Sequence, residues 1–570
     1  MSDPPSQAEE PKDQHDASKT DAGIIVTPGS GEFDQTVSPG DTTCSTEQRP
    51  AVSNNISFLL LLIGLSLAAF VVSLDRTIVA TAVPRITDAF HSPGDVGWYG
   101  SAYLLTSCAF QPIYGRVFVH FDVRSAYYIA FGLFELGCLI SAVAPNSTTL
   151  IVGRAIAGIG DAGVLAGNMN IISLMAPLDK RPIYIGMVGA IFGIGSVMGP
   201  IIGGALTQRL GWRWAFYISL PVAAVTLISL IFFFQPPKNE RIREPFTKRL
   251  FRLDLPGNLL IVTAVIMLLL ALQWSGVTYP WNSSRIIGLL VGFGVESALF
   301  LAWQKCHGKD SLLPLHIMTE RTVAACLAAA FFLGGATLLV VYYLPYWFQA
   351  IGDSSPLQSG INLIPYAIAN FLAAVLAGII VTKTGFYNPP ALIGPAVGAI
   401  GAGLLCTVRV DTSTGRWIGY EIIAGAGFGA AIQQYFLAIQ TILPADEVPI
   451  GTALLLLIQN LSGAIFVSIG NAMVRNRLAS GLESRSEFST SEIVAILSAG
   501  ATDVGNQVNP SQLPALLEAY NQALRSVFIL AIPLSALGTA LALPMRWNSL
   551  KKKVESDSTA ENSDGSMKVV

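Results

Sequence analysis

The sequence predicts an all-α membrane protein of fourteen membrane-spanning helices, built as two six-helix bundles with two helices inserted between them. The 570 residues are 52 % hydrophobic and 12 % charged, whereas soluble domains are roughly 25 % charged. Fourteen stretches are long and apolar enough to span a bilayer, which takes about 20 residues. Charged residues are concentrated in the loops and at the two ends of the chain. Because lipid cannot satisfy backbone polar groups, each apolar stretch should be a helix.

The predicted spans are 56–80, 97–118, 125–144, 149–174, 183–207, 213–235, 255–275, 285–304, 322–349, 358–382, 389–409, 417–442, 449–474 and 523–545. We expect a disordered cytoplasmic tail over 1–50 and an N-terminal six-helix bundle over 51–236. A basic inner loop and the inserted helices 7 and 8 follow over 237–320. The C-terminal six-helix bundle covers 321–546 and contains an outer loop, 475–522, and 547–570 is a second disordered cytoplasmic tail. In the outer loop, Leu513, Leu516 and Leu517 suggest an amphipathic surface helix.

Loop charges predict the orientation, because cytoplasmic loops are enriched in Lys and Arg. With both termini inside, the outer loops carry mainly Arg85, Arg209 and Arg213. The inner loops carry Arg116, Arg124, Lys180, Arg181, Lys238, Arg241, Arg243, Lys248, Arg249, Arg252, Lys305, Lys309, Arg321 and Lys383. We expect a multi-pass, monomeric protein of the plasma membrane, with a vacuolar or vesicle membrane as the alternative.

Composition also argues against several classes of protein. The net charge of −3 provides no basic field for nucleic acid. The six cysteines show no C-x-x-C or metal-ligand spacing and are expected to be buried structural thiols, so no metal and no cofactor are predicted. There is no G-x-x-x-x-G-K-[S/T] motif for an ATP-driven pump. No His, Cys or Ser-His-Asp cluster suggests an enzyme.

The two bundles show a trace of repetition. Gly115 is followed seven residues later by Asp122, and Gly378 is followed seven residues later by Gly385. Both pairs fall in a short inner loop after the second helix of a bundle. Repeated helical blocks are how many secondary transporters are built.

Four motifs in order resemble a known family. Helix 56–80 ends in Leu74-Asp75-Arg76-Thr77-Ile78-Val79, helix 149–174 contains Gly153-Arg154-Ala155, and Gly211-Trp212-Arg213-Trp214 precedes the sixth span. Helix 183–207 contains Gly195, Gly199, Pro200, Gly203 and Gly204. The chain resembles the fourteen-helix drug:proton antiporters of the major facilitator superfamily, in particular the fungal toxin-efflux branch. The resemblance implies the major facilitator fold, proton-coupled efflux and an antiporter motif on the fifth span.

One loop departs from that resemblance. The superfamily usually has G-x-L-x-D-R-x-G-R after its second helix, but here the Asp position holds Val119 and the second Gly position holds Asp122. A charge latch carried by that Asp is therefore not expected in this chain.

Three charged residues are candidates for proton coupling, since charges within the bilayer are costly and usually functional. Asp75 lies in the outer part of helix 56–80, where the alternative is a structural ion pair at the helix end. Arg154 and Asp161 lie on one face of helix 149–174, about 10 Å apart. The resemblance implicates Arg154 in proton transfer. The alternatives are that Arg154 caps backbone carbonyls and that Asp161 bonds a neighbouring helix.

Polar side chains on two helices are candidates for a substrate cavity. Asn168 continues the face of Arg154 and Asp161, and helix 417–442 carries Gln433, Gln434 and Gln440. Amides can orient varied or neutral ligands, although interhelical hydrogen bonding would also explain them. The acids Glu135 and Glu296 are given no role, and Glu421 is expected to be solvated at the outer end of its helix.

Aromatic and glycine patterns complete the candidates. Tyr343 and Trp347 could stack on a flat substrate or form part of an interfacial aromatic belt. The glycine-rich face of helix 183–207, which also holds Gly186, Gly189 and Gly193, predicts a tight seam between the two halves, bent at Pro200. Plain close packing is the alternative.

Two sequons fall in outer loops, and their Asn146 and Asn282 are glycosylation candidates. The sequence as a whole suggests a transporter in the lipid bilayer that couples protons to export of small organic molecules, such as a fungal secondary metabolite, a toxin or drugs. A proton-coupled importer of siderophores or nutrients and a non-transporting membrane sensor are the alternatives.

Overall fold

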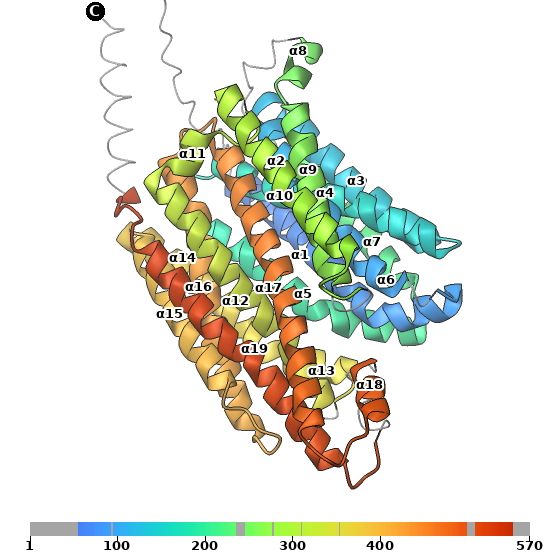
Figure 1. Ribbon diagram of the computed structural model, residues 1–570. Helices are drawn as coiled ribbons and strands as arrows, with labels where there is room; N and C mark the ends of the chain where they lie inside the picture. The colour runs from blue at the N-terminus through green and yellow to red at the C-terminus, as the bar shows by residue number, and fades with distance from the viewer. Residues whose placement is uncertain are drawn as a thin grey trace, which may run out of the picture. The chain divides into compact units, whose positions relative to one another are not determined.

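The computed structural model describes residues 55–92, 95–234, 245–275, 279–308, 311–352, 354–498 and 508–550. The predicted tail 1–50, most of the tail 547–570 and the basic residues Lys238, Arg241 and Arg243 lie outside this part of the chain. The described residues form helices connected by short loops (Figure 1).

The first seven helices form the N-terminal half. They are α1 (Asn55–Phe90), α2 (Val96–His120), α3 (Val123–Val143), α4 (Ser147–Met175), α5 (Arg181–Arg209), the short α6 (Trp214–Tyr217) and α7 (Ser219–Phe233). Helix α1 packs on α5 and α7, and α4 packs between α2 and α3. The predicted sixth span is therefore divided into α6 and α7.

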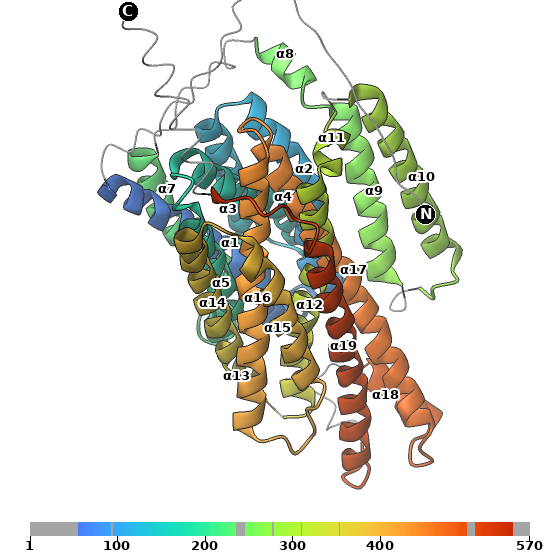
Figure 2. The same ribbon diagram turned by 90° about the vertical axis from the view of Figure 1, so that its left-hand side faces the viewer.

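Three helices follow between the halves. The short α8 (Phe246–Phe251) precedes α9 (Leu255–Trp274) and α10 (Ser284–His307). Helices α9 and α10 form a hairpin that contacts the rest of the protein through α2 and α17 (Figure 2). The inserted pair thus touches both halves.

The C-terminal half contains α11 (Leu315–Thr319), α12 (Arg321–Ala350), α13 (Pro356–Asn362), α14 (Ile364–Thr384), α15 (Asn388–Leu405), α16 (Thr414–Ile442), α17 (Val448–Glu483), α18 (Thr490–Ser498) and α19 (Leu513–Ala542). Helix α16 packs on α14 and α15, and α12 packs on α17 and α19. The two halves meet mainly where α5 contacts α14 and where α2 contacts α17.

Within the described residues, thirteen helices are long and apolar enough to cross a membrane. Helix α2 is continuous over Val96–His120 but is not among the thirteen, because polar residues such as Gln111 and Arg116 lower its mean hydropathy. The helical membrane fold is confirmed, whereas the count of fourteen spans stays a prediction for α2.

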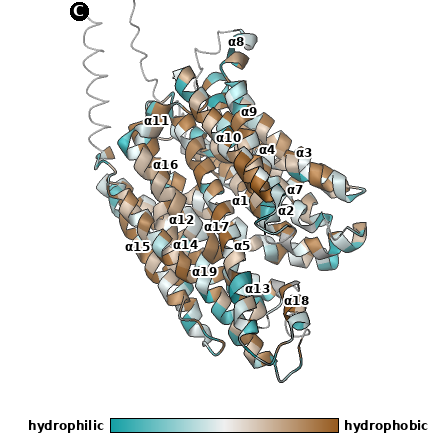
Figure 3. Ribbon diagram, in the orientation of Figure 1, coloured by the Kyte–Doolittle hydropathy of each residue, from teal (hydrophilic) through white to brown (hydrophobic). Residues whose placement is uncertain are grey.

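Apolar stripes show which helix faces meet lipid. On α14, the exposed residues Ile368, Leu372, Leu376 and Ile380 recur every four positions. One face of a helix repeats with this spacing. Hydrophobic colour accordingly covers most of the length of the helices (Figure 3).

The outer loop differs from its prediction. Helix α17 continues to Glu483, and the separate helix α18 follows. Leu513 begins α19, which runs without a break into the last span, and Leu516 is fully buried. The predicted amphipathic surface helix is therefore wrong, because these leucines pack in the extended end of α19.

Asp254 joins the inserted pair to the loop that follows it. Its carboxylate caps α9 and accepts hydrogen bonds from Trp303 Nε1 at 2.7 Å and from the Leu312 amide at 2.6 Å. Arg116, at the end of α2, donates to the carbonyl oxygen of the adjacent Ser311. The last turns of α2 are thus held to this loop through a backbone carbonyl, and Asp122 caps α3 by accepting from the Ser125 amide.

Candidate functional site

Two ion pairs connect α1 to α4. Arg154 Nη1 lies 2.6 Å from Asp75 Oδ2, and Arg76 Nη2 lies 2.6 Å from Asp161 Oδ2. Asp75 and Arg76 are consecutive in the chain, and Arg154 and Asp161 are two turns apart on α4. Each helix therefore contributes one acid and one base, and the charges balance within the site.

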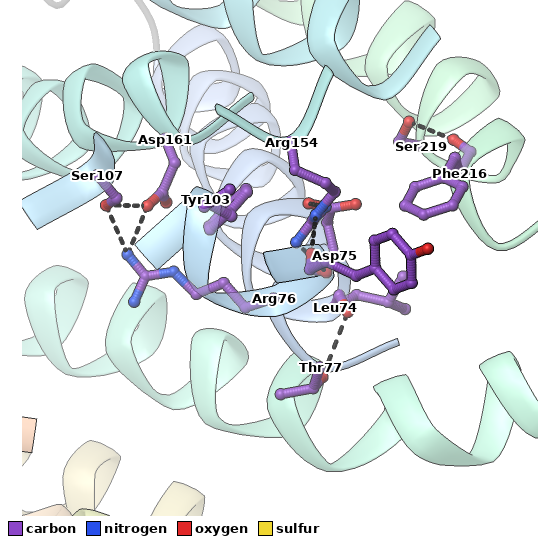
Figure 4. A network of polar contacts seen from close by, with 12 residues as sticks. Leu74, Asp75, Arg76, Thr77, Tyr103, Ser107, Arg154, Asp161, Phe216 and Ser219 are labelled. Carbon is purple, nitrogen blue, oxygen red and sulfur yellow. Dashed lines mark hydrogen bonds and ion pairs between the residues drawn. The ribbon is translucent and has the colours of Figure 1, made fainter. Parts of the chain in front are cut away.

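Helix α2 provides the wall between the two pairs. Tyr103 lies beside both guanidinium groups, with its ring centroid 4.4 Å from Arg154 Cζ and 6.0 Å from Arg76 Cζ (Figure 4). Ser107 donates a hydrogen bond to Asp161 and accepts one from Arg76 at 3.3 Å. Aromatic faces attract cations, so this wall stabilises both arginines without adding charge.

Arg154 is also held by main-chain oxygens. Its Nε donates to the Tyr99 carbonyl at 3.1 Å, and its Nη2 donates to the Asp75 carbonyl at 3.4 Å. The interpretation that Arg154 caps backbone carbonyls therefore describes contacts that exist, and Arg154 also pairs with Asp75. Its role in proton transfer stays a prediction.

The two pairs differ in their access to water. The side chains of Arg154, Asp75 and Asp161 are 0–2 % exposed, whereas that of Arg76 is 14 % exposed. Asp161 Oδ1 is buried and has no hydrogen-bond partner among the described residues. The Arg76–Asp161 pair is thus the one that water can approach from its arginine side.

Asn168 does not continue this site. Its side chain accepts a hydrogen bond from Tyr127 at 2.6 Å and donates to the Leu65 carbonyl at 3.2 Å. These contacts join α4 to α3 and α1 inside the N-terminal half. The expectation that Asn168 faces a cavity is wrong, because its side chain forms hydrogen bonds with two neighbouring helices.

The three glutamines of α16 take different positions. Gln440 Nε2 donates to the Met169 carbonyl of α4 at 3.3 Å, which is a direct bond between the halves. Gln433 lies against Gly189 of α5, also across the halves. Gln434 is buried, and its Oε1 has no hydrogen-bond partner within the described chain. Gln433 and Gln440 therefore lie at the junction between the halves.

Tyr343 and Trp347 are buried structural residues of the C-terminal half. Tyr343 donates to the Val467 carbonyl of α17 at 2.8 Å, and Trp347 Nε1 donates to Asn521 of α19 at 2.9 Å. The predicted substrate stack and the predicted interfacial belt are both wrong for this pair. The neighbouring Tyr342 and Tyr346, which are 48 % and 40 % exposed, have the exposure expected of a belt.

The glycines of α5 face two different neighbours. A β-carbon added at Gly195 would lie 2.7 Å from the Phe70 carbonyl oxygen. One at Gly199 would overlap Thr77, and one at Gly203 would overlap Ile78. These three neighbours all lie on α1. A β-carbon at Gly186 would lie 2.7 Å from the Ala374 carbonyl of α14. Gly195, Gly199 and Gly203 therefore pack α5 on its own half, whereas Gly186, Gly189 and Gly193 face the other half.

Gly204 and Pro200 have separate environments. A β-carbon at Gly204 would meet no atom within 4 Å. Pro200 lies inside the continuous helix α5, opposite Gly360 of α13. The prediction that the whole glycine face forms the seam between halves is wrong, because three of its members pack on α1.

The other intramembrane acids differ from expectation. Glu421 is completely buried, so its predicted solvation is wrong. Glu135 is also buried, and Glu296 accepts a hydrogen bond from Thr263 within the inserted pair. No group of His, Cys, Asp and Glu suited to a metal occurs among the described residues.

Three smaller expectations concern single residues. Asn146 and Asn282 are exposed, and the Asn146 side-chain oxygen caps α4 by accepting from the Thr149 amide at 2.9 Å. Among the described cysteines, Cys306 is exposed, while Cys108, Cys138, Cys326 and Cys406 are buried free thiols. The prediction of buried thiols is therefore wrong for Cys306.

Sequence reasoning missed Arg76, Ser107 and Tyr103 as members of the site. Arg76 could have been identified from the sequence, because it follows Asp75 in the same motif and is a charged residue within a membrane span. Ser107 and Tyr103 carry no such signal, since their role depends on how α2 packs against α1 and α4.

Comparisons with known proteins agree with this architecture. Residues 65–467 match the family model of the Major Facilitator Superfamily. The chain is 43 % identical over 502 residues to "MFS-type efflux pump MFS1" of Arthroderma benhamiae, covering 88 % of this chain and 93 % of that protein. It is 41 % identical over 500 residues to "Efflux pump aflT" of Aspergillus parasiticus, covering 88 % and 97 %.

Solved structures show the same fold at low sequence identity. The proton:xylose symporter XylE aligns with a TM-score of 0.55 and 16 % identity, covering 84 % of this chain and 95 % of that chain. A bacterial homolog of the human lysosomal transporter Spinster aligns with a TM-score of 0.54 and 15 % identity, covering 87 % and 99 %. With its helical fold, its paired charges and these matches, the chain belongs to the major facilitator superfamily.

Proposed function

We propose that this chain is an efflux transporter that exchanges protons for small organic molecules by alternating access. The substrate would be a fungal secondary metabolite, a toxin or a drug. Relatives that share about two fifths of its residues over most of both chains are named efflux pumps. The proposed setting is a lipid bilayer, with protons and a small-molecule substrate as partners.

The proposal of proton coupling rests on the Arg76–Asp161 ion pair. Asp161 is fully buried, but its partner Arg76 is partly exposed, so a proton can reach the pair from the Arg76 side. Protonation of Asp161 would remove the charge that holds Arg76. Arg76 would then be free to change partners, which shifts α1 relative to α4.

The packing of α1 would pass that shift to the seam between the halves. Thr77, one residue after Arg76, lies against Gly199 of α5. About three to four turns earlier in α5, Gly186 and Gly189 contact α14 and α16 of the other half. A movement of α1 therefore acts on the helix that forms the junction.

Gln433 and Gln440 are the proposed substrate contacts. Both lie at the junction, and both keep a buried side-chain oxygen without a hydrogen-bond partner among the described residues. Uncharged amides would accept a donor group of the substrate without selecting its charge. For the protein as a whole we propose a monomer in the plasma membrane with both termini in the cytoplasm.

Inside-out vesicles test this function directly. Membranes of yeast cells that express the full chain would be prepared inside-out with an acidic interior, and uptake of rhodamine 6G and a panel of fungal metabolites would be followed. An exporter that exchanges protons should concentrate its substrate inside. Asp161→Asn should reduce gradient-driven uptake by about 5- to 150-fold, which is the change in affinity that typical coupling free energies produce.

A matched control and two opposite outcomes make the test decisive. Asp411→Asn changes an exposed loop carboxylate and should leave uptake unchanged. A proton-coupled importer would instead lose substrate from the same vesicles. A membrane sensor would move none of the panel, and either result would overturn the proposal.

A further inference from the structure

Glu421 differs from the acids of the ion-pair site. It lies on α16, its residue exposure is 0 %, and no side chain among the described residues bonds its carboxyl oxygens, whose polar neighbour is the backbone of Tyr366. Asp75 and Asp161 are equally buried, but each of them faces an arginine at 2.6 Å. A buried carboxylate without a cation is strongly unfavourable, so the Glu421 environment favours the neutral, protonated form.

The position of Glu421 repeats that of Arg154. A β-carbon added at Gly158 of α4 would overlap the Tyr103 carbonyl of α2, and one at Gly425 of α16 would overlap the Tyr366 carbonyl of α14. Arg154 and Glu421 each precede the close glycine by one turn. The α2–α4 and α14–α16 pairs are thus built alike, with an arginine in one half and a glutamate in the other.

A second pair of contacts supports the same repetition. Gly115 of α2 lies against Pro449 and Ile450 of α17, and Gly378 of α14 lies against Pro182 and Ile183 of α5. Both contacts join the halves, and each places a Pro-Ile step on a glycine. The sites of Arg154 and Glu421 therefore lie on corresponding helices of two repeated units.

The surroundings of Glu421 offer it no cation. The titratable neighbour on α14 is Tyr366, and α15 carries no titratable side chain. On α12, Tyr343 is turned to α17 and Cys326 to Tyr435. The basic residues of α5, α12 and α14 lie in terminal turns, at Arg181, Arg209, Arg321 and Lys383. On α16 itself Arg416 is exposed, and no ion pair to Glu421 occurs among the described residues.

We infer that Glu421 is a second proton-binding site, which carries its proton in the conformation seen here and releases it when the halves rock. The inference rests on the proposed proton-driven export. The backbone of Tyr366, which neighbours Glu421, and Ala374, which contacts Gly186 of α5, belong to the same helix α14. Movement of α14 along α5 would therefore also change the surroundings of Glu421.

Infrared difference spectroscopy on the purified full chain tests proton binding without a substrate. Glu135 is a second buried acid whose carboxyl oxygens have no hydrogen-bond partner among the described residues, so the measurement uses the Glu135→Gln background. In that background the protein should show a carbonyl band of a buried protonated carboxyl, and adding Glu421→Gln should remove it. Glu296→Gln in the same background is the control and should leave that band in place. A band that persists in Glu135→Gln/Glu421→Gln would overturn the inference.

Transport in liposomes then tests the role of the proton. With rhodamine 6G as the probe, Glu421→Gln should lower accumulation driven by a pH gradient about tenfold, while exchange without a gradient is retained. Unchanged accumulation would overturn the inference. If the wild type itself accumulates nothing on a gradient, the proposed function fails, and the infrared band still decides whether Glu421 binds a proton.

Glu421→Met separates a proton site from a structural residue. A neutral carboxyl that bonds no other side chain contributes little to packing beyond its volume, so methionine should largely preserve the unfolding temperature and still lose gradient-driven accumulation. A large fall in the unfolding temperature for Met and Gln alike would assign Glu421 a structural role instead.

Discussion

Arg154 of α4 donates to Asp75 of α1 across 2.6 Å, and both side chains are almost completely buried. Neither charged group is accessible to water, so each depends on the other for its stabilisation. The pair therefore serves as a fixed point of the N-terminal half, and the more accessible Arg76–Asp161 pair, whose arginine is 14 % exposed, is the one we expect to open.

Replacing only Arg154 should destabilise the protein strongly. Arg154→Gln leaves Asp75 buried without its cation, which typically costs about 3–5 kcal/mol. Thermal unfolding of the purified protein, followed by tryptophan fluorescence, measures the loss. The double variant Asp75→Asn/Arg154→Gln removes both charges and should be less destabilised than Arg154→Gln alone. Equal losses would show that the two residues do not act as a pair.

The motif glycines of α5 should not be equivalent. A β-carbon at Gly199 would overlap the Thr77 side chain and lie 3.0 Å from the Ile78 amide, whereas one at Gly204 would meet nothing within 4 Å. Gly199→Ala should therefore cost about 1–3 kcal/mol through overpacking of α1 on α5. Gly204→Ala is the matched control and should be neutral in the same unfolding assay. Equal effects would contradict the packing described here.

Much of the fold could be predicted from sequence because lipid leaves few choices. A long apolar stretch such as 389–409 must form a helix, and its ends follow from turn residues such as Gly385. The intramembrane charges Asp75, Arg154 and Asp161 could also be singled out, since their cost in lipid demands a reason. These inferences depend on local composition alone.

The pairing of those charges could not be predicted in the same way. The seven-residue spacing places Arg154 and Asp161 on one face of α4, but it does not say which helix that face meets. The sequence predicts an interfacial or substrate-binding Trp347, because it lies one turn from Tyr343 near the outer interface, yet Trp347 is buried against Asn521. Such contacts depend on how distant helices cross.

Asp254 should be essential for the join between the inserted pair and the rest of the protein. It has a positive φ of 50°, and asparagine tolerates that conformation. Asp254→Asn therefore removes the charge from the bonds to Trp303 and Leu312 without adding backbone strain, at a cost of about 1–3 kcal/mol. Limited proteolysis should cut the loop around Ser311 faster in this variant.

A control distinguishes charge from general disturbance at that join. Asp179→Asn changes a loop carboxylate between α4 and α5 and should leave the cleavage rate at the wild-type value. Cleavage of Asp254→Asn at that same rate would mean that the loop is held by other contacts, such as the bond from Arg116 to Ser311.

Trp347 provides the sharpest contrast between a structural and a substrate-binding residue. Trp347→Phe keeps the aromatic face but leaves the buried Asn521 oxygen without its donor, which should cost about 1–3 kcal/mol of stability. Trp347 belongs to α12 and packs against α19, away from the junction of the halves. The ranking of substrates in the vesicle assay should therefore stay the same. Gln433→Ala, at the junction, should instead change that ranking with little loss of stability. A changed substrate ranking for Trp347→Phe at unchanged unfolding temperature would return Trp347 to the substrate path.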